Sequence, residues 1–173
     1  MAKDNFRQPK KVSEFDQKVI DVARVTRVMA GGKRMRFRAT VAIGDHKGRV
    51  GWAFGKAADV SEAVNKAVNK AQKHMIKVQM VNQTIPHQVE YKLNAARVLL
   101  KPAKPGTGII AGGSARVILD LSGIPNIYAK LIGRTTNKMA NLAVTFEALK
   151  KLKTPKVRAP KKEVKKEVVG DNQ

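Results

Sequence analysis

The stretch RVTRVMAGGKRMRFRATVAIGDHKGRVGWAFGK, residues 24–56, is the most informative part of this chain. Between residues 34 and 43, basic or polar side chains alternate with apolar ones, and successive side chains of a strand point to opposite faces. One face is expected to be a core face, with Met35, Phe37, Ala39, Val41 and Ile43. The opposite face then carries Arg34, Arg36, Arg38 and Thr40. Because guanidinium groups match phosphate oxygens in geometry, this pattern predicts a sheet that binds a polyanion.

The composition of the whole chain agrees with this interpretation. Thirty-five Lys and Arg against 13 Asp and Glu give the 173 residues a formal charge of +22, and the isoelectric point is near 10.6. Such an excess favours nucleic acid as the partner, with an anionic membrane as the second choice. We expect no membrane association, because no apolar run approaches the ~18 residues of a spanning helix and no lipidation signal is present.

Few residues of this chain suit catalysis or metal binding. Cysteine is absent, which excludes disulfides and thiolate metal sites and fits a reducing compartment. The three histidines, His46, His74 and His87, lie far apart in sequence, and no pair has the spacing of metal ligands. The first residues contain acids and no apolar stretch, so they resemble neither a secretory signal nor a transit peptide. We therefore expect no enzyme activity, no cofactor and no small-molecule substrate.

The first half of the chain predicts an α+β domain. After a flexible basic arm over 1–12, strands are expected at 19–29 (with a possible bulge), 33–43 and 49–55, and a helix at 59–79 with Asp59 as N-cap and Glu62 as its capping-box partner. This gives a three-stranded antiparallel sheet and one helix within 13–80. Gly51, Ala53 and Gly55 leave one face of the third strand bare, either because the chain bends there or because RNA backbone approaches closely. The helix lysines, Lys66, Lys70, Lys73 and Lys77, are interpreted as a solvated face.

A second small domain is expected over 89–153, after a linker at 81–88. Its predicted strands are 89–93, 96–102 and 127–132, and its predicted helices are about 114–122 and 137–152. Residues 154–173 combine many charges with two prolines and no aromatic residue, a composition typical of a disordered tail.

The loop before the helix at 114–122 is rich in glycine. Its sequence, GTGIIAGGS at 106–114, is of a kind that can cradle phosphate with backbone N–H groups. A Walker loop needs a lysine after its last glycine, and Ser114 and Ala115 follow Gly113 here. The loop has a weak resemblance to the phosphate loop of a family of small-molecule kinases. Close packing on RNA or on a protein neighbour is the preferred interpretation.

Two segments carry a resemblance to a known family. Both GKRMRFRATVAIGDHKGRVGWAFGKAADVSEAV at 32–64 and KPAKPGTGIIAGGSARVILDLSGIPNIYAK at 101–130 resemble blocks of the fifth protein of the small ribosomal subunit, in its bacterial form. The resemblance covers roughly residues 17–155. It implies a domain similar to double-stranded-RNA-binding domains, followed by a βαβ-type domain with a left-handed crossover. In free double-stranded-RNA-binding domains the helix begins with lysines, whereas here it begins with Asp59 and Glu62. RNA contact is therefore expected through the strands and the 29–37 loop.

The resemblance also implies a function and a set of partners. Members of the family are structural components of the cytoplasmic ribosome that bind small-subunit rRNA, support assembly and affect decoding accuracy near the place where mRNA enters. The implied protein partners are ribosomal proteins four and eight of the small subunit, and mRNA is a further implied contact. Carried over by position, the protein interface includes Gly108 and Arg116. The predicted RNA-binding residues are Arg24, Arg27, Lys33, Arg34, Arg36, Arg38, Arg49, Lys56, Lys101 and Lys104.

Two other functions remain open at this point. A free-standing RNA chaperone could use the same basic face without stable assembly, and high salt should then wash it from ribosomal subunits. A nucleotide-dependent kinase could be built on the glycine loop, and its ATP turnover should then vanish in a Gly108→Val variant.

Overall fold

The computed structural model describes residues 14–153, so the predicted arm at 1–12 and tail at 154–173 lie outside the described residues. The described part is an α+β structure with three helices and two four-stranded sheets. The predicted fold class is confirmed.

The first sheet has the strand order β1-β2-β3-β4, and all its neighbours are antiparallel. Its strands are β1 (Asp16–Met29), β2 (Gly32–Gly44), β3 (Arg49–Ala57) and the short β4 (Ile76–Lys77). The three predicted strands are present, and the predicted bulge appears as a register shift between Val19 and Asp21. Strand β4 lies within 59–79, the segment for which the sequence predicts a helix, so this part of the helix prediction is wrong.

Helix α1 (Val60–Lys73) covers one face of this sheet and is shorter than the predicted 59–79. Asp59 does occupy the N-cap position, but its side chain makes no capping hydrogen bond, so the predicted capping box is wrong. The glycines of β3 face this helix rather than RNA. A Cβ on Gly55 would lie 2.3 Å from the Ala63 carbonyl oxygen, and one on Gly51 would lie 2.6 Å from that of Ala71. Glycine is therefore required because the helix backbone packs directly on the strand.

The second sheet has the order β5-β6-β8-β7. Its strands are β5 (Val89–Leu93), β6 (Ala96–Pro102), β7 (Ile109–Ile110) and β8 (Ile127–Leu131), and its helices are α2 (Gly113–Leu121) and α3 (Lys138–Lys150). Strand β7 runs parallel to β8 and is joined to it through α2, which makes the expected βαβ unit. The Asn137 side chain caps α3 by accepting hydrogen bonds from the backbone N–H groups of Met139 and Ala140.

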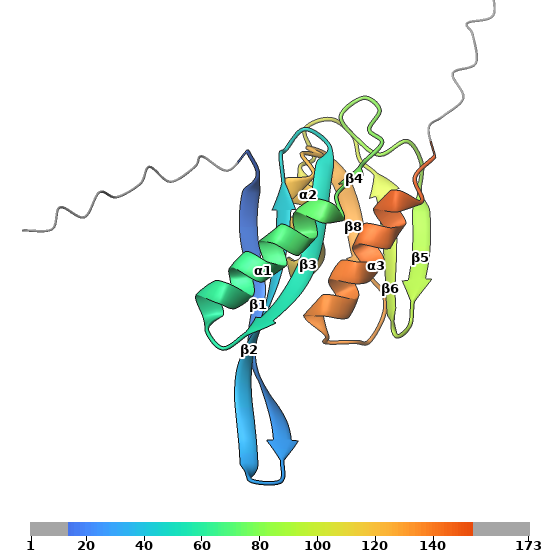
Figure 1. Cartoon of the computed structure of the whole chain (residues 1–173). Helices are drawn as coiled ribbons and strands as arrows, with labels where there is room; N and C mark the ends of the chain where they lie inside the picture. Colours follow the sequence, from blue (N-terminus) through green and yellow to red (C-terminus); the bar gives the residue numbers. More distant parts are fainter. Residues whose placement is uncertain (1–13, 154–173) are drawn as a thin grey trace, which may run out of the picture.

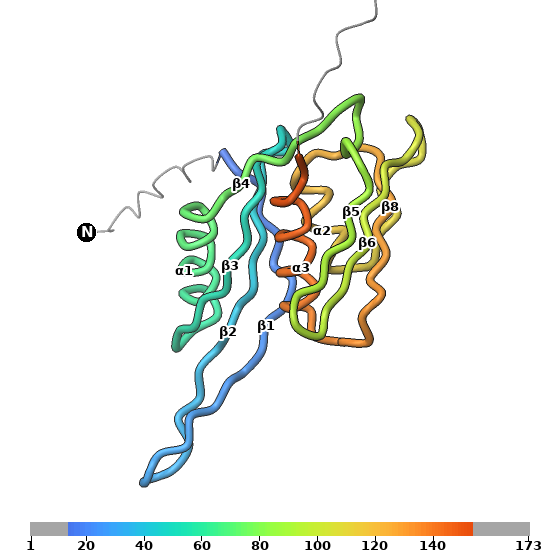
Figure 2. The backbone as a smooth tube through the Cα atoms, turned by 90° about the vertical axis from the view of Figure 1, so that its right-hand side faces the viewer, coloured from blue at the N-terminus to red at the C-terminus, as the bar shows by residue number. Residues whose placement is uncertain are grey.

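The elements form four layers, which Figure 2 shows in the order α1, first sheet, α2 with α3, and second sheet. The two sheets share one core cluster, which includes Ala42 and Val50 from the first sheet together with Leu119, Leu142 and Phe146. This arrangement corrects the expectation that the first sheet has a single core face. Thr40 and Ala42, on the face predicted to be polar, are fully buried because the second half of the chain covers them. The predicted domain limits, 13–80 and 89–153, stay a prediction.

Backbone contacts join the two halves at the end of the molecule opposite the β1–β2 turn. The backbone N–H groups of His46 and Gly48 donate to the carbonyl oxygens of Leu121 and Ser122, at 3.2 and 3.0 Å, and so satisfy the C-terminal end of α2. The fit is so close that a Cβ on Gly123, where φ is +76°, would lie 2.0 Å from the His46 carbonyl oxygen. The β2–β3 connection is therefore a part of the contact between the two halves.

Candidate nucleic-acid interface

The tip of the β1–β2 hairpin projects away from the layered body, as Figure 1 shows at its lower end. From residue 26 to residue 36, every residue of the two strands and of the Ala30–Gly31 turn is exposed. Apolar side chains are exposed there as well, including Val28 at 73% and Met35 at 50%. We call residues 24–37 the distal hairpin. Because α1 and the second half do not extend over it, both of its faces are free to contact a partner.

One side of the distal hairpin and of the adjoining strands gathers half of the ten predicted RNA-binding residues. The register pairs Arg27 with Arg34, Val25 with Arg36, and Arg38 with Lys56, so their side chains lie on the same side of the sheet. Arg27, Arg34, Arg36 and Lys56 line a cavity of about 280 Å³ together with Val25, Thr26 and Met29. We call this set the arginine face. It combines positive charge with apolar surface in one hollow.

The direct pairing of Arg27 with Arg34 has an electrostatic consequence. Like charges directly opposite each other in an antiparallel sheet repel and destabilise the pair. The chain contains no acid between Asp21 and Asp45, so this segment supplies no counter-charge of its own. The repulsion is relieved when an anion lies between the two guanidinium groups.

Two predicted residues, Arg24 and Lys33, lie on the other face of the distal hairpin. Their cross-strand partners are Phe37 and Val28, which belong to the side of the sheet that α1 covers further along. Both are exposed, because the helix does not reach this far. The hairpin is therefore basic on both faces, which the alternation between 34 and 43 alone did not indicate.

Arg38 and Arg49 are engaged within the protein. Arg38 is 4.0 Å from Asp21, which also accepts a hydrogen bond from Lys138 of α3 at 3.0 Å. Arg49 lies at the other end of the sheet, where its Nε donates to Asp45 at 2.6 Å. The alternation pattern does not single out Asp21, although this acid lies inside an otherwise β-rich and basic segment. These ion pairs make Arg38 and Arg49 weaker candidates for phosphate binding than the arginine face.

The Asp45 carboxylate organises the β2–β3 connection. Its side chain is only 6% exposed, and it accepts hydrogen bonds from the Arg49 side chain and from the backbone N–H groups of Lys47 and Arg49. Burial raises its pKa, but these hydrogen bonds and the Arg49 charge outweigh that effect and lower the pKa to about 2. Asp45 therefore stays ionised and fixes the loop that contacts α2.

The remaining predicted site residues belong to the second half of the chain. Lys101 is exposed on β6 and Lys104 in the following loop, away from the distal hairpin. Gly108 has a positive φ of 77°, and its N–H donates to the Asn126 side chain at 3.1 Å. Arg116 is exposed on the first turn of α2. The predicted site residues thus do not form one surface, because some lie on or beside the distal hairpin, Arg49 lies at the opposite end of the first sheet, and the others belong to the second half of the chain.

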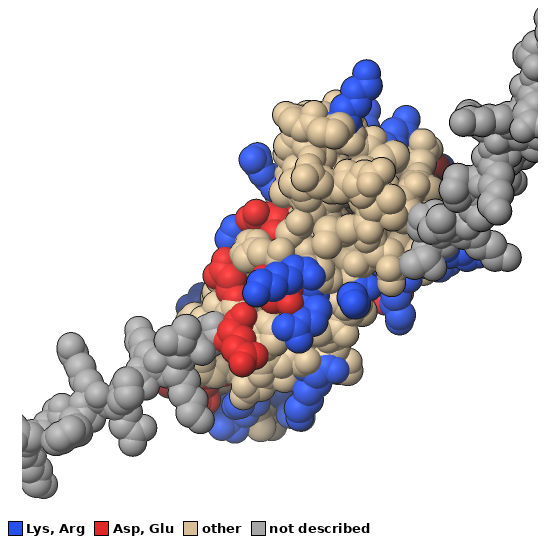
Figure 3. All heavy atoms as spheres, turned by 90° about the horizontal axis from the view of Figure 1, so that it is seen from above, with Lys and Arg blue, Asp and Glu red and all other residues tan. Residues whose placement is uncertain are grey.

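Acidic and basic side chains adjoin one another at the end opposite the distal hairpin, which Figure 3 views from above. There Lys18 donates to Asp120 at 2.5 Å, and His46 lies 3.4 Å from Asp16 and 2.9 Å from the Asp120 carbonyl oxygen. Residues 14–153 contain no cluster of three or more His, Asp or Glu side chains arranged for a metal ion. None of the helices described here is long and apolar enough to cross a membrane.

Known proteins resemble this chain over most of its length. Residues 15–79 match the family described as ribosomal protein S5, N-terminal domain, and residues 91–164 match ribosomal protein S5, C-terminal domain. The small ribosomal subunit protein uS5 of Thermotoga neapolitana is 46% identical over 143 residues, which are 83% of this chain and 80% of that protein. The protein of the same name from a Sulfurihydrogenibium species is 44% identical over 144 residues, 83% of this chain and 74% of that protein. The chain belongs to the family of the small ribosomal subunit protein uS5.

Proposed function

We propose that this chain is a structural constituent of the small ribosomal subunit that binds rRNA through the distal hairpin and is not an enzyme. The observation that carries the proposal is the exposed Arg27–Arg34 pair, two like charges held opposite each other beside Arg36 and Lys56. Such a pair is unfavourable alone and favourable around a phosphate. The names of the relatives, which are small-subunit proteins, support this reading of the charge.

The geometry favours insertion of the hairpin between RNA segments. Arg24 and Lys33 lie on one face and the arginine face on the other, so phosphates on both sides can be neutralised at once. Contacts to phosphate fix the position of a protein but carry no base sequence. The selected feature is therefore the folded shape of the rRNA, since A-form grooves expose little sequence to side chains. Lys101 and Lys104 form a second, separate basic region on the other sheet.

The finer assignments rest on the family resemblance. We propose that the chain supports assembly of the subunit in the cytoplasm, that it contributes to translational accuracy, and that it lies near the place where mRNA enters. Gly108 and Arg116 are proposed contacts with ribosomal protein four, and the second half of the chain is proposed to approach protein eight. Gly108 directly precedes β7, and Arg116 is exposed on the first turn of α2, so both proposed contacts belong to the β7–α2 region of the βαβ unit.

The test is binding of the purified chain to small-subunit rRNA across a salt series. With ~6 phosphates neutralised, the affinity should fall about 10³-fold between roughly 50 and 200 mM salt. A steep slope with a clear preference for this rRNA over unrelated duplex RNA of equal length supports the proposal. A steep slope without preference, together with loss of the chain from subunits at high salt, points to an RNA chaperone instead. A flat slope contradicts RNA binding by the arginine face.

A further inference from the structure

The outer face of the second sheet is open, because α2 and α3 both pack on its inner face (Figure 2). The register sorts the side chains cleanly between the two faces. Val98, Leu100 and Ile127 point into the core and are fully buried. Their neighbours in the same strands, Leu99, Lys101 and Tyr128, point outward and line a cavity of about 400 Å³.

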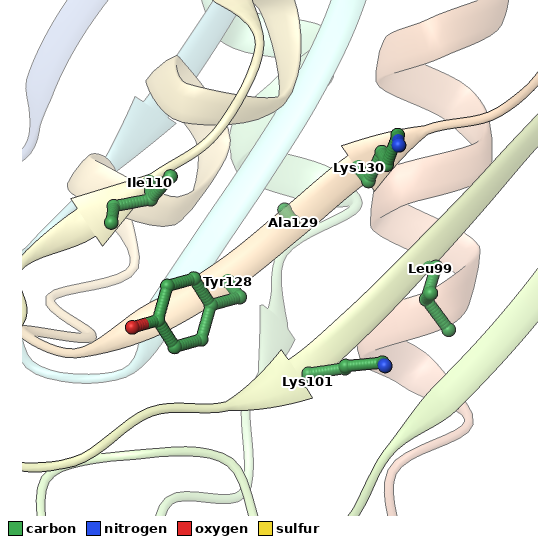
Figure 4. Close-up of a pocket in the computed structure, with 6 residues that line it drawn as sticks. All are labelled: Leu99, Lys101, Ile110, Tyr128, Ala129 and Lys130. Carbon is green, nitrogen blue, oxygen red and sulfur yellow. The ribbon is translucent and has the colours of Figure 1, made fainter.

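This outer face has an aromatic centre with aliphatic and basic neighbours. The register places Ile110, Tyr128 and Lys101 in one row across β7, β8 and β6. Lys130, Leu99 and Glu90 form the next row, and Arg97 and Lys92 the one after it. Figure 4 shows the Tyr128 ring between Ile110 and Lys101. Tyr128 is 42% exposed and Ile110 is 52% exposed, so the ring offers accessible apolar surface at the middle of the sheet.

The charged side chains of this face are predominantly basic. Across the strands β5 to β8 the one acidic residue is Glu90, and its carboxylate already forms an ion pair with Arg97 of β6. Lys92, Lys101 and Lys130 make no salt bridge among the described residues. A partner for this surface must therefore bring negative charge as well as flat apolar groups.

We propose that the outer face of the second sheet binds an unpaired RNA segment, with a base stacked on Tyr128 and its flanking phosphates held by Lys101 and Lys130. Unpaired RNA has both features that such a partner needs, since every base has a flat apolar surface and every linkage a negative charge. The inference rests on the proposed function for its choice of partner, but it concerns a different surface. The arginine face is proposed to contact the phosphates of folded RNA, whereas this face would also stack a base on the Tyr128 ring.

The experiment uses the full chain carrying Arg34→Ala and Arg36→Ala, so that the distal hairpin contributes less to binding, and every Tyr128 variant is compared with this parent. Fluorescence anisotropy measures its affinity for a labelled, unstructured ~12-nucleotide uridine strand, within the site sizes typical of such surfaces. Tyr128→Phe retains the ring, and Tyr128→Leu retains apolar volume without a ring. Stacking predicts that the Phe variant binds within about twofold of its parent, and that the Leu variant binds about five- to 150-fold more weakly. Tyr91→Leu, on the inner side of the same sheet, is the aromatic control.

A second measurement is independent of how the Tyr128 variants fold. Lys101→Ala with Lys130→Ala changes exposed lysine side chains only, and it should lower the salt slope for the single strand by roughly 1.4, at ~0.7 for each phosphate contact. Equal single-strand affinity in the Tyr128→Leu variant and its parent overturns the proposal. Reduced retention of that variant on salt-washed small subunits would then identify the face as a protein-docking surface. The hairpin proposal stands apart, because it is tested by loss of rRNA binding in the arginine variants.

Discussion

The distal hairpin offers the sharpest test of how this chain holds RNA. Arg34 and Arg36 are exposed on one face of β2 and line the same cavity. Replacing both with alanine should remove two phosphate contacts. Each contact contributes about 0.9 to the slope of log affinity against log salt on duplex DNA and about 0.7 on single strands. A fourfold rise in salt concentration therefore lowers the affinity by about 3.5-fold for each duplex-like phosphate contact.

The expected result follows from this arithmetic. Wild-type affinity should fall steeply between roughly 50 and 200 mM salt, and the fall in the double variant should be about 7- to 12-fold smaller. Thermal unfolding should not occur at a lower temperature, because neither side chain is buried and Arg34→Ala removes the repulsion between Arg27 and Arg34. The assay is filter binding or anisotropy with small-subunit rRNA at four or more salt concentrations.

A matched variant carries Lys66→Ala and Lys70→Ala on α1. Lys66 is 3.6 Å from Glu62, and Lys70 lies over the Phe54 ring at 4.9 Å, so both cations already have partners within the protein. The salt slope should change little in this variant. If the helix pair reduced the slope as much as the arginine pair, the assignment of the RNA-binding face would be refuted.

Three further predictions follow from contacts within the body. Gly123→Ala should reduce the free energy of unfolding by more than about 2 kcal/mol, because the new Cβ would clash with the His46 carbonyl and φ is +76°. The control, Gly31→Ala, has open space around it and should change the free energy of unfolding by less than about 0.5 kcal/mol; chemical denaturation measures both. The pKa of Asp45 is lowered to about 2, so its contribution to stability should be complete at pH values above the ordinary carboxyl pKa near 4 and should be lost as the pH falls towards 2. Asp45→Asn should remove this part of the acid dependence of stability, which urea unfolding at each pH measures. Lys18→Ala should cost less than about 1 kcal/mol despite the 2.5 Å contact with Asp120, because both side chains are more than 40% exposed; a larger loss in urea unfolding would contradict this.

Local patterns predicted the strands and helices well, because they depend on residues close together in sequence. The alternation between Arg34 and Ile43 correctly sorted the side chains of β2 between two faces, and the helix predicted at 137–152 is present as α3. Helix α1 was predicted too long because Met75 and Val78 continue its apolar spacing. Val78 instead joins the shared core after the chain has left the helix, and its N–H bonds to Gly48. Strand β7 has only two residues and pairs with a distant strand, so no local pattern could show it.

The candidate site was predictable in composition and less so in arrangement. Alternation tells which side chains share a face, but not which face another part of the chain covers. Thr40 and Ala42 are buried for that reason, and Val50 and Trp52 face the second half of the chain instead of α1. The pairing of Arg38 with Asp21 needs the register of β1 on β2. The pairing of Arg49 with Asp45 spans only four positions and was within reach of sequence reasoning.

The shared core also has a consequence for the time course of synthesis. The core cluster that contains Ala42 and Val50 of the first sheet also contains Leu142 and Phe146 of α3, the last helix of the described chain, so this cluster is complete only when α3 is present. At 5–20 residues per second, the roughly 100 residues between these contacts take about 5 to 20 s to translate. During that interval the nascent first sheet presents an incompletely covered apolar surface to solvent. A newly made copy is therefore most vulnerable to aggregation, and most in need of a folding helper, just before its final helix emerges.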